Sequence, residues 1–572
     1  MAALIDELIR QAPALWRTLI TMPATEPVII MGGGPVGLCA ALELARFDVP
    51  TIVLEQRKTT SWHPKTRNLN TRTMEIAHGW GTTVGKRLRG TDIPDDWKSP
   101  IRFLESVVGQ EFGTIDSQGF TGPGPDVSPS RPVMSSQDLT EKIFYDAAVA
   151  SGLVDLRFGH RVGKVLGGWR DDDTDAAVDV TDLGTGKTYA LRGSALVAAD
   201  GVDSLARREL GVRLDGERAI AHFINCYFRA DIERHVGERR GVLLFVVNQG
   251  AAGVLQPLDA HGRWLCQISV SPQEWDSEAF TTERCHAWIR AAVGVDDLEA
   301  EVLSIGRWRM NATVAERLAH GRIVLCGDAA HQFPPTGGLG ANTGLQGMHN
   351  AMWKLALYVR GRAGRRLLET YDTERRPVAV WAAEQSLRNY HNVGKIGAAI
   401  VLKIDNELSA TNVVAASRRY GNHLGLEFGA AYRSAAVVSD GTTPPEVEDP
   451  YSDYAPSATP GCRAPHTWLG RASGRLSTLD LFGPGFTVLT GSGGDAWRRS
   501  ATAASRRHKV PIASYAIDDT GLEDHEGMFF DRYGITPDGA VLIRPDGHVG
   551  WRSAGTADAE RLHEAVATIL GR

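Results

Sequence analysis

The chain has 572 residues, of which 43% are hydrophobic and 23% are charged, and its formal net charge is −6. This composition predicts two to four globular domains and gives no reason to expect a nucleic acid or an anionic membrane as partner. The six cysteines include no C-x-x-C pair, which predicts free thiols in a cytoplasmic protein rather than a disulfide framework or a zinc site.

Residues 1–25 are expected to form a helical extension. Apolar side chains recur at helical spacing from Leu4 to Ala12, but charged residues interrupt the run, so neither a secretory signal nor a membrane span is expected. We expect these helices to dock on the following domain or on a second subunit. Attachment to a membrane surface is the alternative.

A dinucleotide-binding unit is predicted next. An apolar strand over 28–31 leads into Gly32, Gly34 and Gly37, which have G-x-G-x-x-G spacing, and a helix with small and apolar residues follows. The three glycines would permit a tight turn, close approach of a pyrophosphate and close packing of the helix. The spacing alone is weak evidence in a glycine-rich chain. The next strand ends at Glu55, which can accept hydrogen bonds from a ribose and favours FAD or NAD over NADP.

The segment after this unit is rich in cations. Lys65, Arg67 and Arg72 would suit the phosphates and ribityl chain of a cofactor, or they could form a solvated charged face. Residues 109–133 read as a long loop, which is often a lid or a binding loop. Residues 162–192 predict a β-hairpin.

The pattern changes after a buried strand that ends at Asp200 and Gly201. From about residue 220 to 272 apolar and polar residues alternate, which predicts an antiparallel sheet inserted between the halves of the nucleotide-binding domain. Alternation places Phe223, Asn225 and Tyr227 on one face of a strand. It leaves open which face meets a ligand.

A second cofactor element lies further along the chain. A strand over 322–326 ends at Asp328, followed by a loop rich in Gly and Pro and a helix over roughly 345–359. Asp328 can accept hydrogen bonds from a ribityl chain, and the start of the helix can stabilise negative charge on a reduced flavin ring. Because NAD has neither group, this element favours FAD. His331 is expected to support the loop rather than to act as a base.

Together these elements resemble the single-component FAD-dependent aromatic hydroxylases (class A flavoprotein monooxygenases), in the phenol and polyketide hydroxylase subgroup. The resemblance spans residues 26–395 and includes His63-Pro64-Lys65 and the sequence over 368–377. The chain departs from the family at Gly347, where Asp is common. The resemblance implies that the following residues bind the cofactor: Gly32, Gly34, Pro35, Gly37, Glu55 and Gln56 at the ADP half, Lys65 and Gln137 at the flavin side, Asp200 for both FAD and NAD(P)H, Asp328 at the ribityl chain, and Pro335, Gly337, Gly340, Ala341 and Asn342 along the flavin ring.

The implied fold class is α/β, with a Rossmann-like FAD-binding domain, an inserted antiparallel-sheet domain and a thioredoxin-like C-terminal domain. The expected ranges are 26–200 and 301–395 for the FAD-binding domain, 201–300 for the substrate-binding sheet domain, 396–456 for a helix and linker, and 457–572 for the C-terminal domain. The last domain should not be redox-active, because it lacks C-x-x-C. A glycine-rich turn from Gly491 could alternatively be a second nucleotide site, for NADPH.

The implied reaction consumes NADPH or NADH and O₂, and it hydroxylates a phenolic or polyketide-type ring through a C4a-hydroperoxyflavin. Most of this chemistry belongs to the flavin, so no catalytic side chain is identified. Candidates for the substrate pocket are Asn225, Tyr227, Phe245, Gln256 and Pro335. The alternatives are a Baeyer–Villiger or epoxidising monooxygenase and a flavin-binding dehydrogenase without oxygenase activity. No metal site is expected, and the family implies a homodimer.

Overall fold

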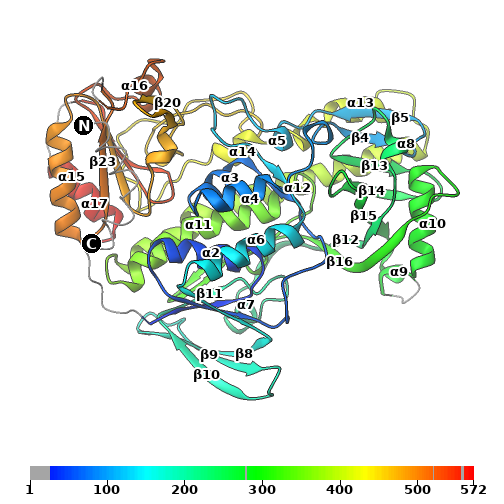
Figure 1. Ribbon diagram of the computed structural model, residues 1–572, viewed down its shortest axis with the longest axis horizontal. Coiled ribbons are helices and arrows are strands. Elements are labelled where there is room, and N and C mark those ends of the chain that lie inside the picture. The colour runs from blue at the N-terminus through cyan, green and yellow to red at the C-terminus, as the bar shows by residue number, and fades with distance from the viewer. Residues whose placement is uncertain (1–25, 277–279, 519–520, 556–559) are drawn as a thin grey trace.

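The structure is a computed structural model that describes residues 26–276, 280–518, 521–555 and 560–572. The expected N-terminal extension over 1–25 lies outside the described residues. In Figure 1 the elements form three groups in a row, with a large sheet on one side, helices over a parallel sheet in the centre and a smaller sheet on the other side. Among the described residues, no helix is both long and apolar enough to cross a membrane.

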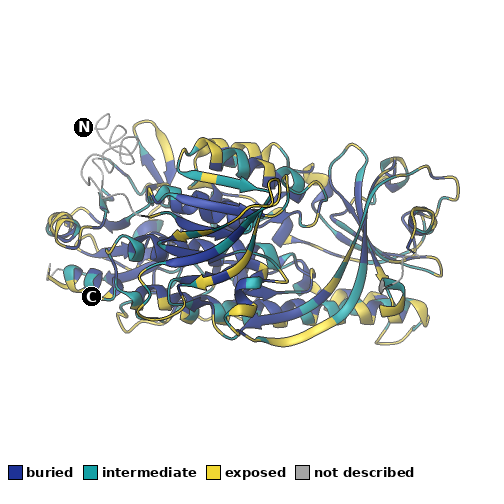
Figure 2. Ribbon diagram, turned by 90° about the horizontal axis from the view of Figure 1, so that it is seen from below, coloured by how far each residue is buried: buried dark blue, intermediate teal, exposed yellow. Residues whose placement is uncertain are grey.

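The central group is built on a six-stranded sheet with the order β17-β18-β11-β1-β2-β7. All neighbours are parallel except β17, which runs antiparallel to β18. A parallel sheet that is covered on both faces needs strands that are apolar almost throughout, and most of these strands are. Figure 2 shows buried segments through the centre of the molecule. The strands are β1 (Val28–Met31), β2 (Thr51–Glu55), β7 (Val154–Phe158), β11 (Ala195–Ala198), β17 (Ala319–His320) and β18 (Ile323–Leu325). This sheet confirms the predicted Rossmann-like fold.

Long helices pack around this sheet and around one another. Helix α2 (Pro35–Arg46) contacts α6 (Gln137–Ala150) and α11 (Leu339–Val359). Helix α11 begins six residues earlier than predicted and also packs along α12 (Arg365–Val401), a helix of 37 residues with Pro377 inside it. The core beneath α2 and α11 is a single cluster of buried aliphatic side chains from both helices and the strands.

The second group is an eight-stranded sheet with the order β19-β16-β12-β15-β14-β13-β4-β5. The inserted sheet predicted from the alternation is present, but four of its strands come from outside 201–300. The sequence did not reveal them because β4 pairs in parallel with β13, a partner far away in the chain. The strands are β4 (Ile101–Leu104), β5 (Glu111–Ile115), β12 (Leu214–Arg229), β13 (Leu243–Val247), β14 (Ala252–Pro257), β15 (Arg263–Val270), β16 (Glu301–Ala315) and β19 (His331–Gln332). The division of the chain into the five predicted ranges stays a prediction.

A small antiparallel sheet packs against the inner strands β1, β2 and β11 of the central sheet. It has the order β10-β9-β8, with β8 (His160–Gly167), β9 (Ala176–Asp182) and β10 (Thr188–Gly193). The hairpin predicted over 162–192 corresponds to these strands. Glu209 attaches them to the short helix α7 (Leu205–Glu209), because its carboxylate accepts a hydrogen bond from the backbone of Val165 at 2.5 Å.

The third group contains a four-stranded sheet with the order β23-β22-β24-β25. β22 and β23 are parallel and the other pairs are antiparallel, which is the arrangement of a thioredoxin-like domain. The elements are β22 (Phe486–Thr490), α15 (Asp495–His508), β23 (Ile512–Ala516), β24 (Ala540–Ile543), β25 (Val549–Ser553) and α17 (Glu560–Ile569). The glycine turn at its start is packed shut, since a Cβ at Gly491 would lie 2.5 Å from the Cα of Pro537. This contact does not favour a second nucleotide site there.

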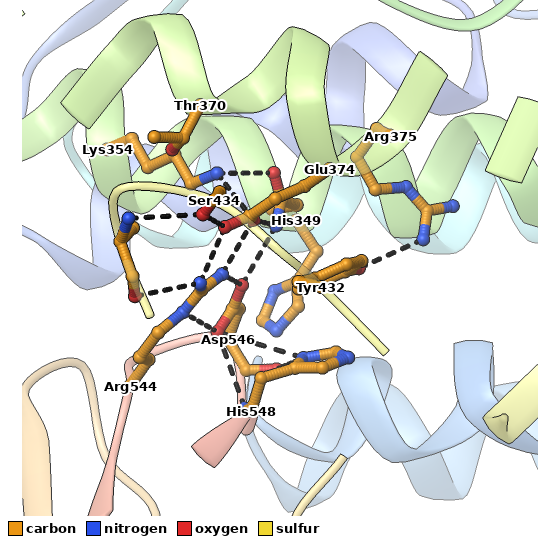
Figure 3. A network of polar contacts seen from close by, with 12 residues as sticks. His349, Lys354, Thr370, Glu374, Arg375, Tyr432, Ser434, Arg544, Asp546 and His548 are labelled. Atoms are coloured by element: carbon orange, nitrogen blue, oxygen red, sulfur yellow. Dashed lines mark hydrogen bonds and ion pairs between the residues drawn. The ribbon is translucent and has the colours of Figure 1, made fainter. Parts of the chain in front are cut away.

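A buried network of charges joins the C-terminal group to the central helices (Figure 3). The Glu374 carboxylate on α12 accepts hydrogen bonds from Lys354 of α11 at 2.7 Å and from both terminal nitrogens of Arg544 at 2.7 and 2.8 Å. Arg544, which follows β24, also pairs with Asp546. The side chains of Lys354, Glu374 and Arg544 have no exposed surface. The two groups therefore meet through a desolvated ionic contact.

Candidate active site

The turn after β1 has the geometry that a pyrophosphate site needs. Gly32 has φ of +100°, and a Cβ there would lie 2.3 Å from the carbonyl oxygen of Ala199. A Cβ at Gly37 would lie 1.9 Å from the carbonyl oxygen of Gly32, so this glycine lets α2 pack onto the strand. Nothing lies within 4 Å of a Cβ at Gly34. The first and third glycines are therefore required by the protein itself, and the second leaves space beside the amino end of α2.

This space opens into one large cavity of about 1220 Å³. The cavity begins at the carboxyl ends of β1 and β2, where ligands bind in open α/β sheets, and reaches the eight-stranded sheet. It is lined by thirteen of the predicted cofactor residues: Gly32, Gly34, Pro35, Glu55, Gln56, Lys65, Gln137, Asp200, Asp328, Pro335, Gly337, Gly340 and Ala341. The two others are Gly37 and Asn342, which lie behind its wall.

At one end of the cavity Glu55 forms a fixed anionic acceptor. Its carboxylate accepts hydrogen bonds from the backbone of Gly33 at 2.8 Å and from the backbone and Nε of Arg57 at 2.8 and 3.0 Å. Burial raises the pKa of Glu55, but the hydrogen bonds and charge of Arg57 outweigh it and hold the pKa below its usual value. Glu55 is therefore ionised at neutral pH, as an acceptor of ribose hydroxyl groups must be.

Two aspartates lie along the middle of the cavity. Oδ2 of Asp200 accepts a hydrogen bond from the backbone of Ala206, whereas Oδ1 is buried without a partner among the described residues. Asp328 lines the cavity and is solvent-exposed there. The surrounding protein raises its pKa, and the charge of Lys65 opposes this effect. Arg207 fixes the turns that carry both acids, because it donates to the carbonyl oxygens of Ala329 at 3.0 Å and Val202 at 2.8 Å.

The loop before α11 forms the next part of the wall. Gly337 and Gly338 have φ of +105° and +66°, and a Cβ at Gly338 would lie 2.8 Å from Nδ2 of Asn68. Asn342 holds this loop to the segment after β2. Its amide donates to the carbonyl oxygens of Asn68 and Gly338, and its Oδ1 accepts from the backbone of Asn70 at 2.9 Å. Asn342 therefore shapes the wall from behind.

The eight-stranded sheet closes the other end of the cavity, which is lined by aromatic and aliphatic side chains. Of the five predicted pocket residues, Phe245, Gln256 and Pro335 line the cavity. Asn225 and Tyr227 do not. The Oδ1 of Asn225 accepts a hydrogen bond from Trp308 at 2.7 Å, and the hydroxyl of Tyr227 accepts one from Arg263 at 2.8 Å. On β12 only Phe223, from the same face, reaches the cavity.

Two residues at this end were assigned differently or not at all from the sequence. Arg67 was grouped with the phosphate-binding cations, but its guanidinium binds the eight-stranded sheet instead. Tyr420 lies in the range predicted as linker, yet it lines the cavity. No local sequence pattern predicts the position of Arg67 at the sheet or of Tyr420 at the cavity, because each position brings together segments far apart in the chain. Arg72 is also not a phosphate ligand, since it binds Glu75 and a carbonyl oxygen after β24.

His331 and Gly347 lie outside the cavity lining. His331 stacks on Phe333 with the ring centroids 4.7 Å apart, and burial lowers its pKa to about 3, so the ring is neutral. A Cβ at Gly347 would lie 3.8 Å from Nε of Arg375, and that Nε has no hydrogen-bond partner among the described residues. A carboxylate in place of Gly347 would therefore meet this guanidinium.

Comparison with known proteins gives the cavity a context. Residues 25–386 match the model of an FAD binding domain, and residues 457–572 match an aromatic-ring hydroxylase C-terminal domain. The chain is 34% identical to tetracenomycin A2 monooxygenase-dioxygenase of Streptomyces glaucescens, over 96% of this chain and 97% of that protein. It is 32% identical to 4-methyl-5-nitrocatechol 5-monooxygenase of a Burkholderia species, over 97% and 100%.

A solved structure agrees over the same length. The crystal structure of the flavin-dependent monooxygenase PieE, in complex with FAD and substrate, superposes with a TM-score of 0.89 at 32% identity, covering 96% of this chain and 100% of that one. FAD is accordingly the cofactor of this protein, and the sequence resemblance to flavin hydroxylases is confirmed. The chain belongs to the FAD-dependent aromatic-ring hydroxylases, which are monooxygenases.

Proposed function

We propose that this enzyme hydroxylates a phenolic ring held between the flavin and the eight-stranded sheet, with NADPH or NADH as reductant. The observation that carries the proposal is the single cavity with two chemically different ends. One end has the glycine turn and the fixed anion of Glu55, and the other has aromatic walls with a few polar groups. This division suits a long dinucleotide followed by an aromatic substrate.

The residues of the first end would bind and orient FAD. The open space at Gly34 and the amino end of α2 would take the pyrophosphate. Glu55 would accept hydrogen bonds from the adenosine ribose, and Asp328 from the ribityl hydroxyl groups. Asp200 lines the same cavity, and its Oδ1 has no hydrogen-bond partner among the described residues. The residues present therefore fit FAD on their own geometry.

The residues around the flavin ring would control solvent and charge. The loop from Pro335 to Ala341 would lie along the ring, and the positive amino end of α11 would stabilise negative charge on it. Phe223, Phe245 and their apolar neighbours would exclude water from the substrate. When bound, FAD supplies the reduction of O₂ and the transfer of one oxygen atom to the ring.

The names of two relatives support an oxygenated aromatic substrate. One is named for tetracenomycin A2 and another for 4-methyl-5-nitrocatechol. Both relatives are named as monooxygenases, and the cavity of this chain has aromatic walls. We therefore extend to this chain only the insertion of oxygen into an aromatic compound. The free state of all six cysteines supports a reducing compartment such as the cytoplasm. The homodimer implied by the family stays a prediction, which sedimentation of the purified protein would test.

The test uses the FAD-loaded enzyme and a panel of phenols and hydroxylated polycyclic rings. A substrate should accelerate NAD(P)H oxidation, and its product should gain one ¹⁸O atom from ¹⁸O₂. Accelerated oxidation that yields only H₂O₂ with every ring would contradict hydroxylation. Formation of an ester or a ring-expanded lactone would favour the Baeyer–Villiger alternative instead.

A further inference from the structure

Arg67 is a buried cation at the substrate end of the cavity. Arg67 lies in the segment after β2, and its side chain reaches the eight-stranded sheet. Only 7% of the residue is exposed. Nε donates to Oε1 of Gln256 at 2.9 Å, and Nη1 donates to the carbonyl oxygen of Pro257 at 2.7 Å. Nη2 donates to the carbonyl oxygen of Val242. All three partners are uncharged oxygen atoms, two of them on β14 and one on the residue before β13.

No carboxylate compensates this charge within the part of the chain that the structure describes. The acids that line the cavity are Glu55, Asp200, Asp203 and Asp328, and all four lie at or after the carboxyl ends of strands in the six-stranded sheet. The eight-stranded sheet contributes none to the lining. Burial lowers the pKa of Arg67 to about 9, which reflects the cost of keeping a cation there without a counter-ion.

The guanidinium has bonding capacity left for a ligand. Arginine carries five N–H groups, and the three hydrogen bonds to the sheet leave one N–H on each terminal nitrogen. Arg67 lines the cavity together with Gln256 and Tyr420. The two unused N–H groups therefore belong to a side chain that lines the same cavity as Gln256 and Tyr420.

We propose that Arg67 binds an anionic oxygen of the aromatic substrate, so that this enzyme selects rings in their phenolate or carboxylate form. This inference rests on the proposed function. It adds that the substrate is anionic and that Arg67 is the residue that binds the anion. The anion would supply the counter-charge that the cavity lacks. A charge-assisted hydrogen bond in such a site is worth roughly tenfold or more in affinity.

The test measures binding to the FAD-loaded enzyme by calorimetry and by the change in flavin absorbance. The probes are matched pairs: a nitrophenol with its methyl ether, a hydroxyanthraquinone with its methyl ether, and a hydroxybenzoate with its methyl ester. The phenol pairs and the benzoate pair separate phenolate from carboxylate. The first variant is Arg67→Met, which keeps most of the apolar length and removes the charge. Arg67→Lys keeps the charge.

Arg102→Met is the control. Arg102 lies on β4 of the same sheet, but its guanidinium pairs with Glu111 at 2.6 Å and it does not line the cavity. In the wild type and in this control, the ionised member of at least one pair should bind tenfold or more tightly than its ether or ester. In Arg67→Met the two members should bind within about twofold.

Equal affinity for both members of every pair in the wild type would overturn the inference, even if Arg67→Met did not fold. So would a preference that Arg67→Met leaves unchanged, or a wild type that binds none of the ionised rings. These outcomes are separate from failure of the proposed function. If the enzyme binds FAD and hydroxylates neutral rings equally well, only the role of Arg67 is contradicted. If it hydroxylates no ring, the proposed function is contradicted.

Discussion

Substitution of Glu374 by Gln tests how the C-terminal group is held to the central helices. The carboxylate receives hydrogen bonds from Lys354, from both terminal nitrogens of Arg544, from Asn350 at 2.7 Å and from Ser434 at 2.6 Å. Burial raises the pKa of Glu374, but the charges of Arg544 and Lys354 outweigh it, and the pKa lies far below its usual value. Gln removes the charge and turns an NH₂ group toward these donors.

The expected loss follows from the count of buried charges. In the wild type Lys354 and Arg544 balance Glu374 and Asp546, so the network is neutral. Glu374→Gln leaves an excess of one positive charge, and Arg544→Met leaves an excess of one negative charge. Removing one partner of a buried pair costs about 3–5 kcal/mol, because the other charge stays desolvated. The double variant leaves Lys354 with Asp546 and is neutral again.

The assay is the urea concentration at which the C-terminal group becomes sensitive to protease, since a multidomain chain need not unfold in two states. In each single variant the C-terminal group should become protease-sensitive at a lower urea concentration. The shift should correspond to a loss of about 3–5 kcal/mol in the free energy of opening. The double variant should be destabilised by less than the sum of the two single variants. A single variant within about 1 kcal/mol of the wild type, or strict additivity, would refute the reasoning about this network.

Three further predictions concern single positions. Asp328→Ala should bind FAD at least tenfold more weakly, while Asp203→Ala, at the same cavity, should change it little; equilibrium dialysis measures both, and full flavin occupancy of Asp328→Ala would refute the ribityl contact. Gly347→Asp should raise the melting temperature by the equivalent of about 1 kcal/mol, because it removes a helix glycine and meets the unpartnered Nε of Arg375; a lower melting temperature would contradict this geometry. Burial raises the pKa of Glu427 to about 8. The native state therefore keeps a proton that the unfolded state has lost above the ordinary carboxyl pKa, and the stability contributed by this group falls as pH rises toward 8, by up to about 1.4 kcal/mol per pH unit. Glu427→Gln should flatten that slope in denaturation measured across this range, and an unchanged slope would count against it.

The cofactor end could be predicted from the sequence because its signals are local. The glycine motif, the strand before it and the helix after it are contiguous in the chain, Glu55 ends an apolar strand and Asp328 follows one. Phe245 and Gln256 were candidates for the substrate pocket, and both line the cavity. The signals at the cofactor end can be recognised because each lies within a short stretch of sequence.

The substrate end could be predicted only in part because its contacts are long-range. Arg67 and Gln256 are 189 positions apart, and nothing near Arg67 indicates that its side chain turns away from the phosphates. Asn225 and Phe223 share a face of β12, but Trp308 from a neighbouring strand binds Asn225 and separates it from the cavity. Tyr420 comes from a segment without regular alternation. Partners far away in the chain hold Arg67 and Asn225.

The most direct test of the account is a crystal structure of the enzyme with FAD and a bound aromatic ring. The account predicts the adenosine ribose at Glu55, the ribityl chain at Asp328 and the flavin ring along the loop from Pro335 to Ala341, with the substrate between that ring and Phe245. A flavin ring outside this cavity, or a substrate that does not lie between the ring and the eight-stranded sheet, would contradict it.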